Sequence, residues 1–401
     1  MTPHDLLHPI SVDAFATDYL GRSMLHREGP AGRFHHILPW NELNNALATT
    51  RYGEGRIQFF KDGRAVPPAL FVQSTNMAAQ HLLKPGAVEH HLANGATLVF
   101  NSIDEVIPDI RGLAAAFEDL LDIRVNINLY AGVSRHGFDI HWDSHDTLIL
   151  QVYGQKAWRV YRPTVVHPLG RCRAEQARPS DDTIVWDRVL TAGSILYMPR
   201  GWWHQARPCN HLSVHLTMGL NRPTPLDFLT WIKRRLADLE SLRGDIALNA
   251  GHGGGDAWLG ELRGALAKHI TAEAVETFRT YARSRVPVRV VPVLPNVDAD
   301  VRPILLSGSE RVYLKRERLL LIEHHRDGDK LGFSSGGTQW MCPNAFAKAL
   351  GRLKHQPAAR VSDLCALVPS TSARDLRLFL MALHAGGVIA VEEPAHDAVL
   401  V

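Results

Sequence analysis

The pattern of hydrophobic and polar residues changes near residue 124. Between residues 11 and 100, short helical patterns at 12–20 and 40–47 alternate with polar turns, and no repeat occurs. Beyond Arg124, short runs rich in Val, Ile, Leu and Tyr are separated by turns that contain Gly, Pro or Asp; the runs are RVNINLY, TLILQVY, KAWRVYRP, SILYM and HLSVHLTM. This pattern predicts an antiparallel β-sandwich or barrel.

Helical periodicity replaces the strand pattern after Pro223. Leucine and isoleucine recur at near-helical spacing in two stretches, which predicts two helices with apolar stripes at Leu229, Ile232, Leu236 and Leu239 and at Leu259, Leu262, Leu266 and Ile270. Four glycines between 251 and 255 separate the two stretches. Such stripes suit a dimer contact, and burial within one chain is an equally good interpretation.

The last hundred residues are predicted to form a small α+β domain that follows a proline-rich connector at 286–303. Helical patterns at 345–353 and 361–367 precede a third helix, which Ser370 or Thr371 can cap and Gly386-Gly387 can end before the strand VIAVE. The third helix has one apolar face, made by Leu376, Phe379, Leu380 and Leu383. The order of three helices and a strand is typical of a winged helix.

A DNA-binding function for this last domain is poorly supported by its charges. The third helix offers only Arg374 and Arg377, and the expected wing begins with Glu392-Glu393, which would repel phosphate. A structural or protein-contact role is therefore the favoured interpretation. The predicted fold class is α+β, with a β-domain at 1–222, a helical domain at 223–285 and a winged-helix-like domain at 286–401.

Composition narrows the class of protein. The chain has 401 residues, 45% of them hydrophobic and 21% charged, and its net charge of +3 is too small for binding nucleic acid over the whole surface. Four dispersed cysteines, the lack of a signal-peptide pattern and the lack of a long apolar run favour a cytoplasmic protein outside the membrane. The unusual feature is the number of histidines, 22.

The segment His141-Trp142-Asp143 is the strongest candidate for chemistry. In a strand, residues two apart point to the same face, so His141 and Asp143 can reach one metal ion. The motif is weak evidence alone, but His204 follows a Pro-Arg-Gly turn further along the chain. Two histidines and one carboxylate form the facial triad of Fe(II) oxygenases, which leaves coordination positions open. His145 is a rival third ligand, because it shares the expected strand face.

Lys156 is the second candidate. It lies in a predicted barrel strand beside Ala157, Trp158 and Val160. A buried lysine needs a carboxylate partner, because an unpaired buried charge is costly. A surface lysine is the alternative interpretation.

Two long segments resemble a known family. NLYAGVSRHGFDIHWDSHDTLILQVYGQKAWRVYRP and LTAGSILYMPRGWWHQARPCNHLSVHLTMGL are similar to the JmjC branch of the Fe(II)/2-oxoglutarate oxygenases, and most closely to the ribosomal oxygenases, which hydroxylate ribosomal proteins. That family combines a JmjC double-stranded β-helix, a cupin-like jelly roll, with a helical dimerisation domain and a C-terminal winged helix. The resemblance covers nearly the whole chain.

The resemblance implies a role for each matching residue. His141, Asp143 and His204 would bind Fe(II), and Lys156 would pair with the distal carboxylate of the cosubstrate 2-oxoglutarate. Asn128 and Tyr130 match an N-x-Y pair that lines the same pocket. Further contacts with cosubstrate or substrate are expected from one face of the strand HLSVHLT, which presents Ser213, His215 and Thr217.

The expected function is a dioxygenase that uses Fe(II), 2-oxoglutarate and O₂ to hydroxylate an Arg or His side chain of a ribosomal protein, in a homodimer. One alternative keeps this chemistry on another peptide, such as a natural-product precursor, or removes an N-methyl group. A non-enzyme alternative is a metal-sensing cupin fused to a winged helix that regulates DNA. The candidate substrate rim lies at 51–90 and 165–190, where the sequence is polar and irregular.

Overall fold

The computed structural model of the chain describes residues 1–392, except 52–54, 75–80, 134–137, 171–177, 210, 247–256, 288, 290–305, 307, 315–320, 325–328 and 357. The chain divides into two compact units, Met1–Arg222 and Pro223–Val401. Each unit has its own hydrophobic core. The glycine-rich stretch at 251–255 and most of the proline-rich connector lie outside the described residues.

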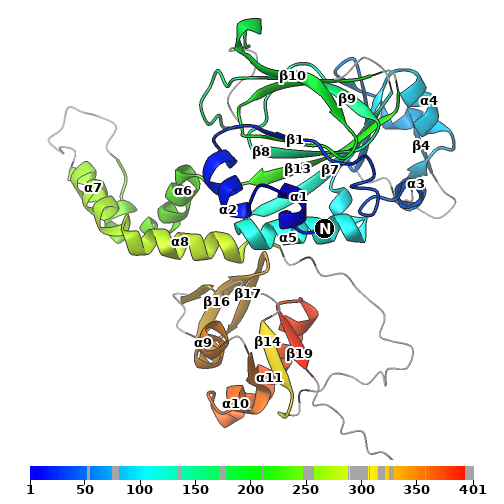
Figure 1. Ribbon diagram of the computed structural model, residues 1–401. Coiled ribbons are helices and arrows are strands. Elements are labelled where there is room, and N and C mark those ends of the chain that lie inside the picture. Colours follow the sequence, from blue (N-terminus) through cyan, green and yellow to red (C-terminus); the bar gives the residue numbers. More distant parts are fainter. Residues whose placement is uncertain are drawn as a thin grey trace, which may run out of the picture. The chain divides into compact units, whose positions relative to one another are not determined.

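The first unit is built on two antiparallel sheets (Figure 1). The larger sheet has the strand order β1-β11-β8-β13-β7-β6-β2-β3, and the smaller has the order β10-β9-β12. The strands of the larger sheet are β1 (Leu25–Arg27), β2 (Ile57–Lys61), β3 (Arg64–Ala65), β6 (Thr97–Phe100), β7 (Arg124–Gly132), β8 (Asp146–Tyr153), β11 (Ile195–Met198) and β13 (Ser213–Asn221). Those of the smaller sheet are β9 (Gln155–Tyr161), β10 (Ile184–Thr191) and β12 (Trp203–Pro208), while β4 (Val72–Ser74) and β5 (His81–Leu83) form a separate pair.

The two faces of the larger sheet differ in chemistry. Along β13, the alternate residues Val214, Leu216, Met218 and Leu220 belong to the main hydrophobic core. The intervening residues, which include Ser213, His215 and Thr217, point to the opposite face, between the two sheets. An apolar cluster with members from β8, β9, β10 and β11 joins the two sheets. The polar residues on the inner face of β13 therefore lie between the two sheets, where a jelly roll binds its ligands.

Helices cover the outer face of the larger sheet. The helix α5 (Pro108–Leu121) starts with proline at its first position and packs Ile110, Leu113 and Phe117 into the main core. It runs along the sheet below β7 and β8 in Figure 1. The other helical segments of this unit are α1 (Pro3–Leu7), α2 (Val12–Ala14), the π-helix η1 (Phe15–Tyr19), α3 (Trp40–Thr49), α4 (Ala87–Ala93) and the 3₁₀ turns η2 (Pro68–Leu70), η3 (Ile103–Glu105) and η5 (Asp181–Thr183).

The second unit begins with three helices and continues as a mixed segment. The helices α6 (Pro225–Leu236), α7 (Ala257–His269) and α8 (Ala272–Ser284) share a small core around Trp231, Ile232 and Phe278, and η6 (Glu240–Leu242) follows α6. A larger core holds the rest. Its elements are β14 (Arg311–Leu314), β15 (Leu321–His324), β16 (Lys330–Ser335), β17 (Thr338–Pro343), η7 (Asn344–Phe346), α9 (Ala347–His355), β18 (Ala358–Arg360), α10 (Val361–Cys365), η8 (Ser370–Ser372), α11 (Ala373–Ala385) and β19 (Ile389–Glu392).

The structure agrees with the pattern of the strand-rich segment and corrects other expectations. Strands form at all five predicted runs. The strands β2 to β5 and most of β10 also form in the segments predicted to be irregular, β6 and β12 form outside the predicted runs, and α5 and α8 are not predicted. The helix α11 begins at Ala373 after the turn η8, and its N-cap Ser372 makes no side-chain hydrogen bond, so the expected cap by Ser370 or Thr371 is wrong. No helix within the described ranges combines the length and the apolar character needed to cross a bilayer.

Candidate metal centre

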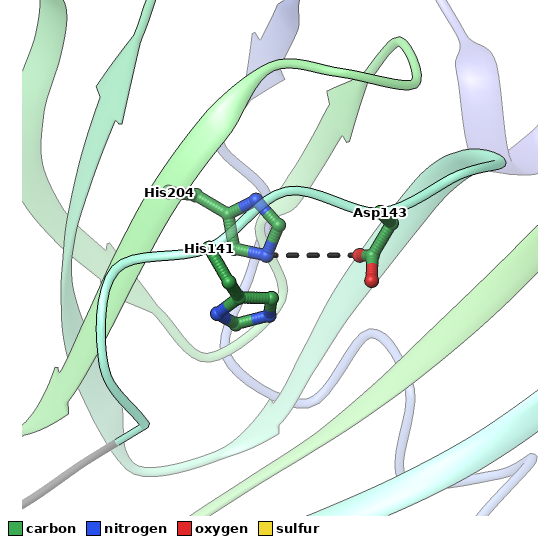
Figure 2. A group of neighbouring side chains, drawn as sticks. All are labelled: His141, Asp143 and His204. Atoms are coloured by element: carbon green, nitrogen blue, oxygen red, sulfur yellow. Dashed lines mark ion pairs between the residues drawn. The ribbon is translucent and has the colours of Figure 1, made fainter. Parts of the chain in front are cut away.

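Three candidate ligands come together between the sheets of the first unit (Figure 2). One ligand atom from each of His141, Asp143 and His204 lies within 4.8 Å of the other two. His204 Nε2 is 3.7 Å from an Asp143 carboxylate oxygen, and the two imidazole centroids are 4.3 Å apart. This arrangement can hold one metal ion through two nitrogens and one oxygen.

Backbone pairing holds the two ligand segments together. His204 lies in β12, whereas His141 forms an isolated bridge with it, in which the His141 N–H donates to the His204 carbonyl at 3.1 Å and the reverse bond is 2.7 Å. Asp143 lies in the loop before β8. The expectation that His141 and Asp143 share a strand face is therefore wrong, and the bridge to β12 is what sets their position.

Hydrogen bonds also fix the orientation of both imidazoles. Nδ1 of His141 is 2.8 Å from the Asp139 carbonyl, and Nδ1 of His204 is 3.1 Å from the Trp202 carbonyl. A carbonyl oxygen only accepts, so each Nδ1 carries the proton and each Nε2 keeps its lone pair for a metal. Burial lowers the pKa of His204 to about 4, helped by the nearby His141 and opposed by Asp143. The imidazole is thus neutral near pH 7, as a metal ligand must be.

The rival ligand His145 has a different environment. An added Cβ at Gly219 would lie 3.0 Å from His145 Nε2, so the imidazole packs against β13 at this glycine. Among the described residues, the ligand group contains His204 and not His145. The structure thus brings together the three residues named first from the sequence.

Lys156 is buried between the sheets, and the described residues place no counterion beside it. It lies on β9 with 5% of its surface exposed, and its ammonium is 5.7 Å from the Trp158 ring centroid. No hydrogen bond or ion pair of this ammonium is found in the part of the chain that the structure describes. Burial lowers the pKa of Lys156 to about 7. The carboxylate partner expected from the sequence is therefore not supplied by the described protein residues.

A second buried group near Lys156 has a ring nitrogen to which no described residue hydrogen-bonds. His215 on β13 is 3% exposed, and within the described ranges its Nδ1 has no hydrogen-bond partner. Its ring stacks on Tyr130 with centroids 5.1 Å apart, and the Trp158 ring lies edge-on at 5.6 Å. Burial lowers the pKa of His215, and the Lys156 charge lowers it further. These groups form a polar pocket wall that can receive hydrogen-bonding atoms of a ligand.

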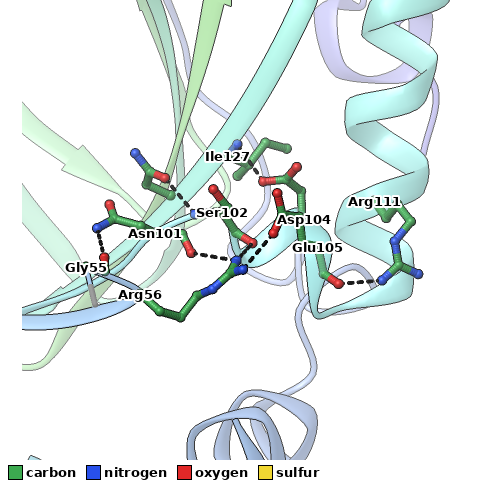
Figure 3. Close-up of polar contacts among 9 residues, drawn as sticks. Gly55, Arg56, Asn101, Ser102, Asp104, Glu105, Arg111 and Ile127 are labelled. Carbon is green, nitrogen blue, oxygen red and sulfur yellow. Dashed lines mark hydrogen bonds and ion pairs between the residues drawn. The ribbon is translucent and has the colours of Figure 1, made fainter. Parts of the chain in front are cut away.

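Asn128 and Tyr130 lie two residues apart on β7, so both face the space between the sheets. Burial raises the pKa of the Tyr130 phenol to about 12, and the charge of Asp143 adds to this rise. The Asn128 side-chain oxygen accepts the N–H of Ser102 at 2.9 Å, and Ser102 belongs to the polar cluster drawn in Figure 3. The same cluster includes the Asp104 carboxylate, which accepts the Ile127 N–H at 2.8 Å. The Asn128 oxygen is therefore already used by the protein, and the Asn128 side chain also hydrogen-bonds to the Tyr130 phenol, which lowers the pKa of that phenol and so opposes the rise.

The remaining two candidates on β13 differ from each other. The Ser213 hydroxyl accepts a hydrogen bond from Gln151 at 2.9 Å and is buried. Thr217 lies opposite Asn128 in the β7 ladder and is partly exposed. Thr217 is thus the better placed of the two to meet a molecule that enters between the sheets.

The sequence reasoning missed Asp146, a carboxylate close to the metal centre. Asp146 is 1% exposed and accepts the Arg200 N–H at 2.9 Å and the Tyr197 hydroxyl at 2.8 Å. The guanidinium of Arg222 lies 2.9 Å from the same carboxylate. An acidic residue in an otherwise apolar strand, DTLILQVY, was the available signal for a buried partner.

Comparison with known proteins agrees with this geometry. Residues 106–228 match the JmjC domain family. The chain is 25% identical over 291 residues to the bifunctional lysine-specific demethylase and histidyl-hydroxylase NO66 of Drosophila persimilis, covering 66% of this chain and 39% of that protein. It is 23% identical over 267 residues to the uncharacterized protein YxbC of Bacillus subtilis, covering 61% of this chain and 78% of that protein.

A solved structure extends the likeness in fold. The ribosomal oxygenase YcfD of Escherichia coli, in complex with cobalt and 2-oxoglutarate, matches with a TM-score of 0.52 and 16% identity, over 95% of this chain and 98% of that one. The protein described here spans only 39% of the length of the fly protein NO66. The chain therefore contains a segment, residues 106–228, that is similar to the JmjC domain family, and it has a two-sheet, cupin-like fold similar to that of YcfD.

Proposed function

We propose that this protein is an Fe(II)- and 2-oxoglutarate-dependent hydroxylase. The observation that carries the proposal is the buried ammonium of Lys156, which has no ion pair with any described residue and lies in the same inter-sheet space as a two-histidine, one-carboxylate group. A buried cation without a counterion is unfavourable unless a ligand supplies the negative charge. A dicarboxylate that reaches from the metal to Lys156 would supply it.

The residues present fit both groups. His141, Asp143 and His204 would hold Fe(II), because this donor set is the facial triad that leaves coordination positions open. When bound, iron and 2-oxoglutarate supply the oxidising chemistry, in which O₂ and 2-oxoglutarate are converted to succinate and CO₂ while a substrate C–H becomes C–OH. The ammonium of Lys156 would pair with the distal carboxylate, and that pairing restores its usual charged form.

The other inner residues would orient the cosubstrate and the substrate. The Asn128 amide, the Tyr130 phenol and the His215 imidazole can donate hydrogen bonds into the pocket, and Tyr130 stays protonated because its pKa is raised to about 12. Trp158 supplies an apolar wall beside both His204 and His215. Together these residues would exclude water and fix one orientation of the reacting groups.

We infer that the substrate is an Arg or His side chain of a ribosomal protein. The relatives support a protein substrate, since one is named a histidyl-hydroxylase and demethylase and another a ribosomal oxygenase. The same chemistry on another peptide, such as a natural-product precursor, is the second candidate. Removal of an N-methyl group is the third, and the demethylase activity named for the fly relative supports it.

The architecture adds two proposals about the second unit. The helices α6 to α8 leave Leu226, Leu229, Trp258 and Ile270 exposed beside their small core, which supports a homodimer made through residues 223–285. The order α9, α10, α11 and β19 supports a winged-helix-like domain within 286–401 that contacts protein rather than DNA. We further propose a cytoplasmic protein that works on ribosomal proteins.

A turnover experiment tests the proposed activity. The full chain, Fe(II), 2-oxoglutarate and O₂ are incubated with purified ribosomal proteins, and succinate and peptide masses are measured. Hydroxylation gives succinate and a peptide heavier by one oxygen atom, whereas demethylation releases formaldehyde and gives a lighter peptide. Absence of 2-oxoglutarate turnover by protein that binds iron would overturn the proposal. A metal-dependent shift of DNA in place of turnover would favour the sensor alternative.

A further inference from the structure

The three ligands sit on two short segments that depend on each other. His141 and Asp143 belong to a loop, and His204 is the second residue of β12, directly after the turn at residues 199–202. The bridge between His141 and His204 joins the segments at one end. At the other end, the Gly201 N–H donates to the Asp143 carbonyl at 3.0 Å. Metal geometry therefore depends on how the 199–202 turn is held.

The conformation of this turn requires support from its surroundings. Gly201 has φ +84°, and a Cβ at this position would lie 2.5 Å from Pro168, so the backbone is closely packed there. The next residue closes the turn, because the Trp202 N–H donates to the Pro199 carbonyl at 3.2 Å. The remaining amide, that of Arg200, donates to the Asp146 carboxylate at 2.9 Å.

The Asp146 carboxylate contacts three donor groups of the first unit. One oxygen accepts the Arg200 N–H, and the other accepts the Tyr197 hydroxyl and lies 2.9 Å from the Arg222 guanidinium. The Gly21 N–H in turn donates to the Tyr197 hydroxyl at 2.6 Å. Asp146 itself begins β8, three residues after Asp143. One buried carboxylate thus links the loop that carries Asp143 to the turn that leads to His204.

We propose that Asp146 is a positioning residue for the metal centre. Its carboxylate sets the distance between the Asp143 loop and the 199–202 turn, and so the distance between Asp143 and His204. The inference rests on the proposed metal site. Outer partners of metal ligands act in this way, and losing one typically lowers metal affinity by about 10- to 100-fold.

Titration of the full chain with Co(II), followed by visible absorption, tests the proposal without relying on catalysis. Asp146→Ala removes every contact of the carboxylate and should weaken Co(II) binding by about 10- to 100-fold and change the absorption spectrum. Asp146→Asn keeps one oxygen that can accept the Arg200 N–H, so its loss of affinity should be smaller. This milder variant also covers the case in which Asp146→Ala fails to fold.

Matched variants separate positioning from general stability. Asp104 is a buried carboxylate of the same unit, 2% exposed, that accepts a backbone N–H on β7 (Figure 3). Asp104→Asn and Asp104→Ala should lower the thermal unfolding temperature but leave the Co(II) affinity and spectrum unchanged. Arg222→Met, which touches Asp146 but not the turn, should affect Co(II) binding less than Asp146→Ala does.

Three outcomes would overturn the inference, and they are distinguishable. If the wild-type protein binds Co(II) and both Asp146 variants bind it equally well with the same spectrum, Asp146 has only a structural role. The same conclusion follows if the Asp104 variants lose affinity in step with the Asp146 variants. If the wild-type protein binds no Co(II), the proposed metal site fails and this inference fails with it.

Discussion

The two units of the chain differ in what they bury. In the first unit, the buried polar residues include three carboxylates, one lysine and two histidines: Asp104, Glu118, Asp146, Lys156, His204 and His215. In the described part of the second unit, the buried polar residues are three serines: Ser284, Ser334 and Ser335. Burial of an ionisable group lowers the folding stability unless the group has partners. The first unit therefore carries a possible cost in folding stability that the described part of the second unit does not carry.

The buried ionisable groups of the first unit form two classes. Asp104, Glu118 and Asp146 accept hydrogen bonds from backbone or side-chain donors and are satisfied by the fold itself. Lys156 and the Nδ1 of His215 find no such partner among the described residues. The satisfied carboxylates stabilise the fold, whereas Lys156 and His215 lie where the proposed function places the ligand.

The largest effect is expected from removal of a metal ligand. His204→Ala takes one of three donor atoms from the site, so it should abolish iron binding and turnover. His145→Ala is the matched control, because this histidine is close in sequence to the ligands but packs over Gly219. It should keep most of the iron. Iron content by elemental analysis and succinate formation check both variants. The reverse result would make His145 the third ligand.

A smaller effect is expected from Lys156. Lys156→Ala removes the cation proposed for the distal carboxylate, so the KM for 2-oxoglutarate should rise by about 10- to 100-fold while iron stays bound. Steady-state kinetics with varied 2-oxoglutarate measures this change. An unchanged KM would place the cosubstrate elsewhere and would remove the main support for the proposed function.

The same lysine gives a pH-dependent difference in stability without cosubstrate. Its pKa falls from 10.5 in the unfolded chain to about 7 in the fold, so between these values the unfolded chain binds more protons. The destabilisation from Lys156 is thus complete below pH 7 and disappears as the pH rises toward 10.5. Lys156→Met should therefore be more stable than the wild type at pH 7, and the gap should narrow at higher pH. Chemical denaturation at several pH values checks this.

Much of the barrel could be predicted from the sequence because its central strands are buried on at least one face. The runs that became β7, β8 and β13 are dense in Val, Ile and Leu, and their turns contain Gly or Pro. The strands β2 and β10 were missed because they are short or mixed in polarity and are stabilised by pairing with distant strands. In contrast, the helix α5 was predictable from the sequence, because its apolar residues recur at helical spacing.

The candidate site was predictable only in part. The spacing of His141 and Asp143 points to a metal, but the assignment of His204 came from a family resemblance, because nothing local identifies a residue so far along the chain. The contacts of Asp146 with Arg222 and Tyr197 could not be predicted either. They depend on which strands become neighbours, and this is decided by the whole sheet rather than by any segment.

A core substitution in the second unit should affect stability and leave the metal centre unchanged. Leu380 is fully buried in the larger core of that unit, so Leu380→Ala should cost about 2–5 kcal/mol of unfolding free energy. Calorimetry measures this loss, and Co(II) titration of the same protein should give the wild-type affinity. A parallel loss of Co(II) affinity would show that the two units are energetically coupled, which the comparison does not predict.

The smallest effect is expected from the arginines of α11. Arg374 is exposed and Arg377 is half-buried, while the exposed Asp375 lies between them and Glu392 ends β19. Two cations that neutralise two phosphates would give weak binding, with a slope of only about −1.8 for log K against log salt concentration. The double variant Arg374→Ala, Arg377→Ala should therefore keep the wild-type turnover. At physiological salt, neither the wild type nor this variant should form a specific complex with DNA. Gel shifts with genomic fragments check this. A strong shift that disappears in the double variant would show that the second unit binds DNA, and it would contradict the proposed protein-contact role.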